Sequence, residues 1–356
     1  MVLVLIMAAA IWGIGHLMKV PPKARWPLIW LLLVAVLAAQ VVLPEGHSVR
    51  EATGGSAAAW LTLIALGAIV AAYRQLLQFL RSRAQTPEDE EPASKPATMS
   101  STELDRYARH IILREIGGPG QKRLREARVL VIGAGGLGSP ALLYLAGAGV
   151  GTIGVIDDDT VDNTNLQRQI IHTDARIGMP KVFSAQAAVT ALNPFVTVRP
   201  YNRRLTEDIA DDLLQDYDLM LDGTDNFDTR YLANEVAVRA GKPLISGALS
   251  QWEGQVSVFD PASDAPCYRC VFPEPPAPGL APSCAEAGVV GPLPGVIGSM
   301  MAIEAVKLIT GAGAPLRNEM LIYDALYGET RKIALRRDPA CATCGQSLPK
   351  AMGGAN

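Results

Sequence analysis

Three apolar runs fill the first quarter of the chain. Met1 to Met18 is apolar apart from His16, Trp26 to Leu43 contains Gln40 as its one strongly polar residue, and Ala57 to Tyr73 has no charged residue. Each run approaches the roughly 20 residues that an α-helix needs to cross a bilayer. No basic residue precedes the first run and no small-residue cleavage pattern clearly ends it, so the pattern predicts a membrane anchor rather than a secretory signal. The alternative is a set of buried helices in a soluble domain, and the first run would also suit a segment that inserts poorly.

Basic residues in the short loops predict how this anchor is oriented. Three lie between the first and second runs and three follow the third: Lys19, Lys23, Arg25, Arg74, Arg81 and Arg83. The loop Pro44 to Ser56 has only Arg50, which Glu45 and Glu51 offset. The positive-inside rule then places the N-terminus outside and everything after the third run in the cytoplasm, as in a multi-pass protein of the cytoplasmic membrane. No acid or base within the runs suggests a transport pathway.

A composition shift separates the anchor from the rest of the chain. Residues 85–101 are rich in Pro, Glu, Ser and Thr, a composition that buries too little apolar surface to offset the entropy of ordering. We therefore expect four parts: a membrane anchor of about three transmembrane helices over 1–84, a flexible acidic linker over 85–101, a folded body over 102–346 and a disordered tail over 347–356. The formal net charge of -3 gives no basic field, so composition offers no support for a nucleic-acid partner.

The body begins with a helical period from Glu103 that Gly117 to Gly120 is expected to break, and a second short helix to Glu126. A β-branched strand, Arg128 to Ile132, then leads into a glycine turn and a helix of small residues, and a second strand ends at Asp157. The turn glycines are Gly133, Gly135, Gly136 and Gly138. Such glycines let the backbone approach a phosphate at a helix N-terminus, and an acid after the second strand suits a ribose. The pattern predicts nucleotide binding, and the alternative is an ordinary tight turn.

The residues after Asp157 bear on which nucleotide is bound. Asn165, Arg168 and Lys181 follow it, and Lys181 begins a helix that runs to Leu192. Two cations and an amide near a helix N-terminus suit a polyphosphate that develops charge. A dehydrogenase would instead need a nicotinamide site and a proton donor such as histidine, and neither His110 nor His172 has an obvious role in this part of the chain. An NAD-dependent dehydrogenase remains the distant alternative.

Further strands complete the predicted sheet. They span Thr197 to Tyr201, Leu219 to Asp222, Leu244 to Ser250, Glu253 to Phe259, Met320 to Tyr323 and Thr330 to Leu335, with helices over Phe227 to Ala240 and Val296 to Thr310. We expect an α/β fold of the Rossmann-like type, a mostly parallel sheet with an antiparallel extension. Asp225 follows a strand end, where such sheets hold ligands, and its carboxylate suits Mg²⁺. The alternative for Asp225 is an N-cap of the next helix.

Four cysteines form two CxxC pairs, Cys267 with Cys270 and Cys341 with Cys344. In a cytoplasmic body this spacing predicts a structural zinc site with four thiolate ligands, and redox catalysis is the alternative. The fifth cysteine, Cys284, lies in a Pro- and Gly-rich segment predicted to be a mobile loop. It is either an inert thiol or a nucleophile.

Taken together, these motifs resemble the MoeB/ThiF/HesA family, the prokaryotic relatives of ubiquitin-activating enzymes. The segments that carry the resemblance are RYARHIILREIG, GAGGLGSPALLYLAGAGVG, DDDTVDNTNLQRQ, MPK, DGTDN, CYRC and CATC, in this order between Ser101 and Gln346. The resemblance does not extend to the apolar runs at the N-terminus. It suggests a membrane anchor added to an enzyme that is free-standing in other members.

The resemblance implies that ATP and Mg²⁺ are used to adenylate the C-terminal glycine of a small ubiquitin-like sulfur carrier, with release of pyrophosphate. It implies that Arg109 reaches across a homodimer to the phosphates and that Asp157, with Asp159 beside it, binds the nucleotide ribose. Asn165, Arg168 and Lys181 would surround the polyphosphate, and Asp225 would hold magnesium. Losing Arg168 or Lys181 should slow the reaction on the order of 10²-fold or more.

The segment from Cys267 to Gly298 resembles the molybdopterin-synthase branch of the family more than the thiamine branch, which remains an alternative. Cys284 matches a crossover-loop cysteine that bonds covalently to the carrier in some members and is dispensable in others. Some relatives carry a C-terminal rhodanese domain; we expect none here and therefore a separate sulfur donor. A membrane scaffold with an inactive nucleotide fold is a further hypothesis, but all the active-site cations are present.

Overall fold

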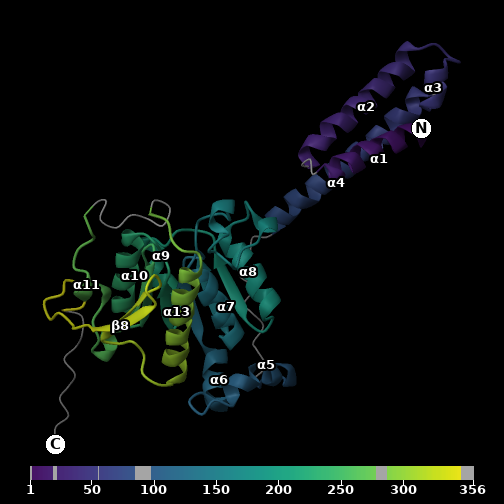
Figure 1. The fold of residues 1–356 in the computed structure, drawn as a ribbon. Helices are drawn as coiled ribbons and strands as arrows, with labels where there is room; N and C mark the ends of the chain where they lie inside the picture. Colours follow the sequence, from purple (N-terminus) through teal and green to yellow (C-terminus); the bar gives the residue numbers. More distant parts are fainter. Residues whose placement is uncertain (1, 19–21, 55, 85–97, 278–286, 346–356) are drawn as a thin grey trace, which may run out of the picture. The chain divides into compact units, whose positions relative to one another are not determined.

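The computed structural model describes residues 2–18, 22–54, 56–84, 98–277 and 287–345. The chain divides into two compact units, Met1–Ala93 and Ser94–Asn356 (Figure 1). Each unit is described by itself below.

The first unit is helical. It contains α1 (Val2–Leu17), α2 (Pro22–Val42), the short α3 (Ser48–Ala52) and α4 (Ala57–Ala84). A small core joins three of these helices through Val4, Val36 and Trp60. The ring nitrogen of Trp60 donates to the Thr53 carbonyl oxygen, which ties the start of α4 to the end of α3. Within α2 and α4, Arg25–Val42 and Ala58–Leu76 are long and apolar enough to cross a membrane, whereas the apolar stretch of α1 is shorter.

The second unit is built on one eight-stranded sheet with the order β3-β2-β1-β4-β5-β6-β7-β8. Its strands are β1 (Arg128–Ile132), β2 (Thr152–Ile156), β3 (Thr197–Tyr201), β4 (Leu219–Asp222), β5 (Leu244–Leu249), β6 (Glu253–Phe259), β7 (Glu319–Asp324) and β8 (Glu329–Ala334). The strands from β3 to β5 pair in parallel, and β6 to β8 extend the sheet antiparallel. The predicted strands are confirmed, and their ends differ from the observed ends by about one residue at most, which is within the usual uncertainty of strand assignment.

Helices cover both faces of this sheet. They are α5 (Ser101–Ile111), α6 (Gly117–Glu126), α7 (Gly138–Ala148), α8 (Lys181–Leu192), α9 (Glu207–Gln215), α10 (Phe227–Ala240), α11 (Tyr268–Val271) and α13 (Pro292–Thr310), with the short 3₁₀ turns η1 (Asn163–Asn165), η2 (Asp174–Arg176) and η3 (Pro261–Ser263). One core packs α7, α8 and α13 against the sheet through Leu142, Val182 and Ile297. The other core packs α9 and α10 through Leu214 and Val236. Although α13 is also long and apolar, half of it is buried in this core.

Two helix boundaries differ from the sequence expectation. The break between the first two helices falls at residues 112–116 and not at Gly117 to Gly120, because α6 starts at Gly117 and places Pro119 in its first turn. Likewise, α13 starts at Pro292, before the expected Val296. The reason is the same in both cases: N–H groups in the first turn have no partner within the helix, so proline is tolerated there.

The strand order creates a switch point beside β1. The chain passes from β1 to β2 on one side of it and later returns to β4 on the other side. The loops that leave the carboxyl ends of β1 and β4 therefore diverge, and an open sheet holds its ligands in the crevice between such loops.

Candidate functional site

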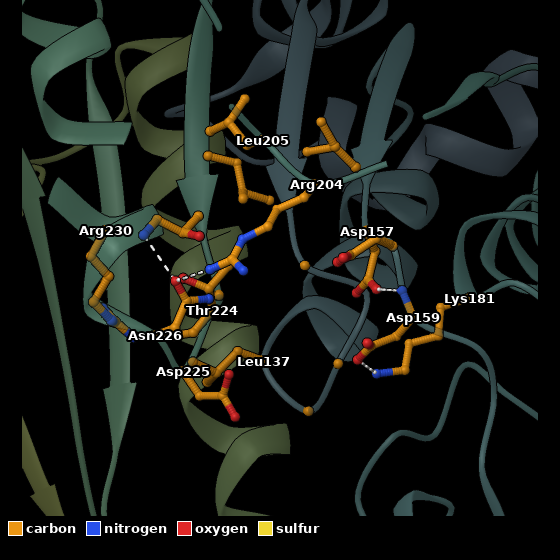
Figure 2. A pocket seen from close by; sticks show the side chains of 18 of the residues that line it. Leu137, Asp157, Asp159, Lys181, Arg204, Leu205, Thr224, Asp225, Asn226 and Arg230 are labelled. Carbon is orange, nitrogen blue, oxygen red and sulfur yellow. Dashed lines mark hydrogen bonds and ion pairs between the residues drawn. The ribbon is translucent and has the colours of Figure 1, made fainter. Parts of the chain in front are cut away.

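A cavity of about 560 Å³ lies at the carboxyl ends of β1, β2, β4 and β5. Its lining includes nine residues that the sequence singled out: Gly133, Gly135, Gly136, Asp157, Asp159, Asn165, Arg168, Lys181 and Asp225. Figure 2 shows Asp157, Asp159 and Lys181 on one side of this space and Asp225, Asn226 and Arg230 on the other. The fold therefore brings together residues that come from separate loops, and the cavity is large enough for a nucleotide.

The glycine turn has two different requirements for glycine. Gly133 has φ +92°, a left-handed conformation that disfavours other residues. Gly138 does not line the cavity, but a Cβ there would lie 1.9 Å from the Gly133 carbonyl oxygen. Gly138 thus allows α7 to start directly against the turn, while Gly135 and Gly136 face the cavity.

The Ala134 peptide of this turn is held from both sides. Its N–H donates to Asp157 Oδ2 at 2.7 Å, and its carbonyl oxygen lies 2.9 Å from His172 Nε2. Because a carbonyl only accepts, Nε2 of His172 carries a proton, and Nδ1 lies 2.9 Å from the Ser184 hydroxyl, which can donate or accept. Burial lowers the pKa of His172 below its ordinary value, which favours the neutral imidazole with Nδ1 as an acceptor. His172 is therefore a support of the turn, which sequence reasoning missed.

The other oxygen of Asp157 accepts from the Asp159 N–H at 2.8 Å. Burial raises the pKa of the Asp157 carboxyl, and the nearby Lys181 ammonium and the two N–H donors act against that rise. Each carboxylate oxygen has a second lone pair, so Asp157 retains acceptors for a ligand hydroxyl.

Lys181 and Arg168 bring positive charge to the turn. The Lys181 side chain is 6% exposed, and its Nζ lies 2.7 Å from Asp159 Oδ2. Arg168 Nη2 donates to Asn165 Oδ1 at 2.7 Å, so these two side chains are positioned together. The cations face the cavity at the start of α8 and beside the glycine turn.

On the opposite side, Asn226 rather than Asp225 is the N-cap of α10, because its Oδ1 accepts from the Thr229 N–H at 2.9 Å. The alternative interpretation of Asp225 as an N-cap is therefore wrong. Among the described residues, Asp225 is exposed in the cavity and has no hydrogen bond or ion pair. A carboxylate in this state is available to a cation.

Arg230, which sequence reasoning also missed, fixes the loop that carries Asp225. It is 5% exposed, lies 3.3 Å from the buried Asp222 carboxylate and donates to the carbonyl oxygens of Thr224 and Gly247. Nothing in the local sequence marks it, because its partners come from β4, the loop after β4 and β5. Arg204 is a further missed lining residue; it reaches toward Asn226 Oδ1 at 3.3 Å (Figure 2).

Besides Gly138, two further predicted site residues are not part of this cavity as the structure describes it. Arg109 is exposed on α5 and does not line the cavity of its own chain. Cys284 lies outside the described residues. Within the described lining there is also no histidine, which gives no support to the dehydrogenase alternative.

The two CxxC pairs come together next to the site. Ligand atoms of Cys267, Cys270, Cys341 and Cys344 all lie within 4.8 Å of one another. The Cys267–Cys341 and Cys270–Cys344 sulfurs are 3.6 and 3.4 Å apart, and the Cys267–Cys270 sulfurs 3.8 Å. A tetrahedral site with Zn–S bonds of about 2.3 Å needs sulfurs about 3.8 Å apart. The cluster thus has the ligands and the size of a metal site.

Comparison with known proteins gives consistent results. A model of the ThiF family matches residues 107–343. The sulfur carrier protein adenylyltransferase of Thermus thermophilus is 52% identical over 247 residues, which cover 68% of this chain and 91% of that protein. MoeZ of Mycobacterium tuberculosis, a probable adenylyltransferase/sulfurtransferase, is 53% identical over 255 residues, which cover 70% of this chain and 64% of that protein.

Solved structures with the same fold include PaaA, with a TM-score of 0.59 and 22% identity over 74% of this chain and 81% of that chain. Escherichia coli MccB with ATP has a TM-score of 0.56 and 22% identity over 64% of this chain and 69% of that chain. At this level of identity the similarity shows the fold alone.

Proposed function

Because the chain belongs to the ThiF family, we propose that it adenylates the C-terminal glycine carboxylate of a ubiquitin-like sulfur-carrier protein, with ATP as the nucleotide donor. The observation that carries this proposal is the cavity at the switch point, which Lys181, Arg168 and the turn glycines line and in which Asp225 lies across from Lys181. The name of the Thermus relative supports the same activity, because the match covers nearly all of that protein.

The reaction needs charge and alignment more than covalent help. A carboxylate oxygen of the carrier attacks the α-phosphorus of ATP, and a bond forms between them. The bond from the α-phosphorus to the bridging oxygen breaks, and pyrophosphate leaves with that electron pair. Both reactants are anionic, so the site must offset their repulsion and hold them in line.

The side chains divide this work by position. Lys181 and Arg168 would stabilise the phosphates, with Asn165 holding the Arg168 guanidinium in place through their 2.7 Å contact. Asp157 would accept a ribose hydroxyl on its remaining lone pairs while it holds the Ala134 N–H. Asp159 would position Lys181, since their ion pair is the contact that fixes the ammonium in the free protein.

Asp225 would hold Mg²⁺. The fit rests on its exposed carboxylate in the cavity, since Mg²⁺ is usually bound by one or two carboxylates together with substrate phosphates. When bound, the ion would add positive charge to the phosphates. Arg230 ties the loop that carries Asp225 to β5, because it donates to the Gly247 carbonyl oxygen.

The four cysteines would hold a structural Zn²⁺. Burial raises the pKa of the Cys267 and Cys270 thiols, that of Cys270 to about 11, so a cation is needed to keep them as thiolates. Tyr268, which lies between these two cysteines in the sequence, lines the cavity. A metal here would therefore tie the C-terminal segment to one wall of the site.

Arg109 would serve the site of a second copy in a homodimer, since it does not line its own cavity. Mixing Arg109→Ala chains with Lys181→Ala chains should restore part of the activity that each lacks alone. No restoration in mixed dimers would contradict the shared site.

The membrane anchor is proposed from α2 and α4, which are long and apolar enough to span a bilayer. With the orientation that the loop charges predict, the catalytic unit would face the cytoplasm. Fractionation of a chain that starts at Met99 tests this: it should leave the membrane fraction, and continued sedimentation with membranes would contradict the anchor.

The carrier would be of the molybdopterin-synthase type, and the thiamine type is the alternative. Sulfur would come from a separate donor, and a covalent role for Cys284 stays a prediction. The test of the function is ATP–pyrophosphate exchange by the full-length protein. Exchange should require a carrier that ends in Gly-Gly and should disappear when the diglycine is removed. No exchange with any such carrier of the same organism would contradict the proposal.

A further inference from the structure

Helix α5 depends on the rest of the second unit for its position. It has 11 residues, and an isolated helix of that length is marginally stable in water. A capping box closes its first turn, in which Ser100 and Glu103 exchange hydrogen bonds. The cap stabilises the end of the helix but does not orient it. The orientation must come from the side chains that α5 places against other elements.

Two side chains of α5 are buried, those of Glu103 and Tyr107. They are four positions apart and therefore lie on one face of the helix. Glu103 pairs with Arg125 of α6 at 3.1 Å. Tyr107 is 3% exposed, and its hydroxyl accepts a hydrogen bond at 2.8 Å from Nδ2 of Asn193, the residue that follows α8. This face thus ties α5 to α6 and to the end of α8.

The ring of Tyr107 is held as closely as its hydroxyl. A Cβ on Gly149 would lie 2.5 Å from Tyr107 Cζ, so the ring packs against bare backbone at the end of α7. Asn193 is itself fully buried, and its Nδ2 also donates to the Ala146 carbonyl oxygen at 2.6 Å. Because both the ring and the hydroxyl are fixed, α5 cannot turn about its axis without losing these contacts.

The same contacts determine where Arg109 lies. Successive residues of an α-helix are about 100° apart around its axis. Arg109, two positions after Tyr107, therefore points away from the buried face, and it is exposed. Any rotation of α5 would carry the Arg109 guanidinium with it.

We propose that Tyr107 is a positioning residue, which sets the rotation of α5 and thereby places Arg109 for the nucleotide site of a second copy. This inference rests on the proposed function in that Arg109 serves that site. A competing path runs through α8, which ends at Asn193 and begins at Lys181 in the cavity of the same chain. The two paths predict opposite results in mixed dimers.

The test uses the full-length protein in detergent with ATP and Mg²⁺ as the probe. In calorimetry, Tyr107→Leu should weaken ATP binding about tenfold or more, as Arg109→Ala should, because a hydrogen bond to a charged group is lost. Tyr107→Phe, which loses only the hydroxyl, should show a smaller effect of the same kind.

Mixed dimers then locate the effect. Tyr107→Leu chains paired with Lys181→Ala chains should regain part of the tight ATP binding, because an intact Lys181 and a well-placed Arg109 meet in one of the two sites. Tyr107→Leu chains paired with Arg109→Ala chains should regain none, because every site then receives a defective α5 from the other copy.

Tyr217→Leu is the matched control. Tyr217 is 1% exposed, its hydroxyl lies 2.8 Å from that of Tyr201, and it does not line the cavity. This variant should lose stability as Tyr107→Leu does and still bind ATP like the wild type. The comparison separates the positioning of Arg109 from a general loss of packing.

The inference is overturned if Tyr107→Leu binds ATP like the wild type, if its tight binding fails to return with Lys181→Ala chains, or if it returns with Arg109→Ala chains. No recovery when Arg109→Ala and Lys181→Ala chains are mixed would contradict the shared site and this inference with it. The expected recovery of ATP binding, without carrier-dependent exchange by the wild type, would instead contradict the proposed function and leave this inference standing.

Discussion

The Arg230–Asp222 pair offers the sharpest prediction about how the site is held together. Asp222 is fully buried at the end of β4, and Arg230 lies 3.3 Å away as its cation. Arg230 also donates to Ser246 Oγ at 3.0 Å and to the Gly247 carbonyl oxygen at 2.7 Å. Arg230→Leu would remove these contacts and leave a buried carboxylate without a counter-charge.

Breaking a buried pair from one side typically costs about 3–5 kcal/mol, because one charge stays desolvated and unpaired. For a domain of this size, each kcal/mol shifts the unfolding temperature by roughly 2–4 °C. We therefore expect Arg230→Leu to lower the unfolding temperature of the full-length protein by roughly 10 °C in a fluorescence-monitored melt.

A matched control lies on the same helix. Arg239 pairs with Asp211 at 3.0 Å, but both side chains are about half exposed, so Arg239→Leu should cost no more than about 1 kcal/mol. Adding Asp222→Asn to Arg230→Leu should recover part of the lost stability, since the unpaired charge is then absent, with a coupling of about 0.5–3 kcal/mol. A loss as small as that of the control, or a strictly additive cycle, would contradict a stabilising buried pair between Arg230 and Asp222.

Other predictions test separate parts of the site. Lys181→Met should slow ATP–pyrophosphate exchange by about 10²-fold or more, since a preorganised charge is lost, whereas the exposed Lys122→Met should not; a loss below about tenfold would contradict the assigned role. Cys341→Ser should reduce bound zinc, measured by metal analysis, well below the content of the wild type, which we expect to be about one per chain; equal zinc in both would contradict a four-thiolate site. His172 has a folded pKa below its ordinary 6.5, so its contribution to stability is present above about pH 6.5 and is lost as the pH falls toward the folded pKa. His172→Gln should flatten the decline of the unfolding temperature between about pH 7 and 5, and an unchanged slope would contradict this assignment.

Local signals in the sequence were sufficient for the elements that carry the nucleotide. The β-branched run of β1, the glycines after it and Asp157 at the end of β2 each depend on neighbours within a few residues. Parallel pairing of β1 with β2 and β4 then brings the strand ends together. For this reason the predicted cavity residues could be named before the cavity was known.

The residues that sequence reasoning missed depend on contacts distant in the chain. His172 meets the Ala134 carbonyl 38 positions away, and Arg230 on α10 meets Ser246 and Gly247 on β5. Single-residue types such as histidine and arginine carry no local signal for such partners. Asp225 and Asn226 show the opposite problem, because both residue types favour an N-cap and only the geometry distinguishes them.

The most direct test of the account is the fate of the α-phosphate. The full-length protein is incubated with a carrier that ends in Gly-Gly and with ATP labelled on either the α- or the γ-phosphate, and the carrier is then weighed by intact mass spectrometry. We predict that the carrier gains the mass of one AMP, retains the α label and not the γ label, and that pyrophosphate is released in equal amount. A carrier that gains no AMP, or that acquires the γ label, would contradict the adenylation that the cavity is proposed to catalyse.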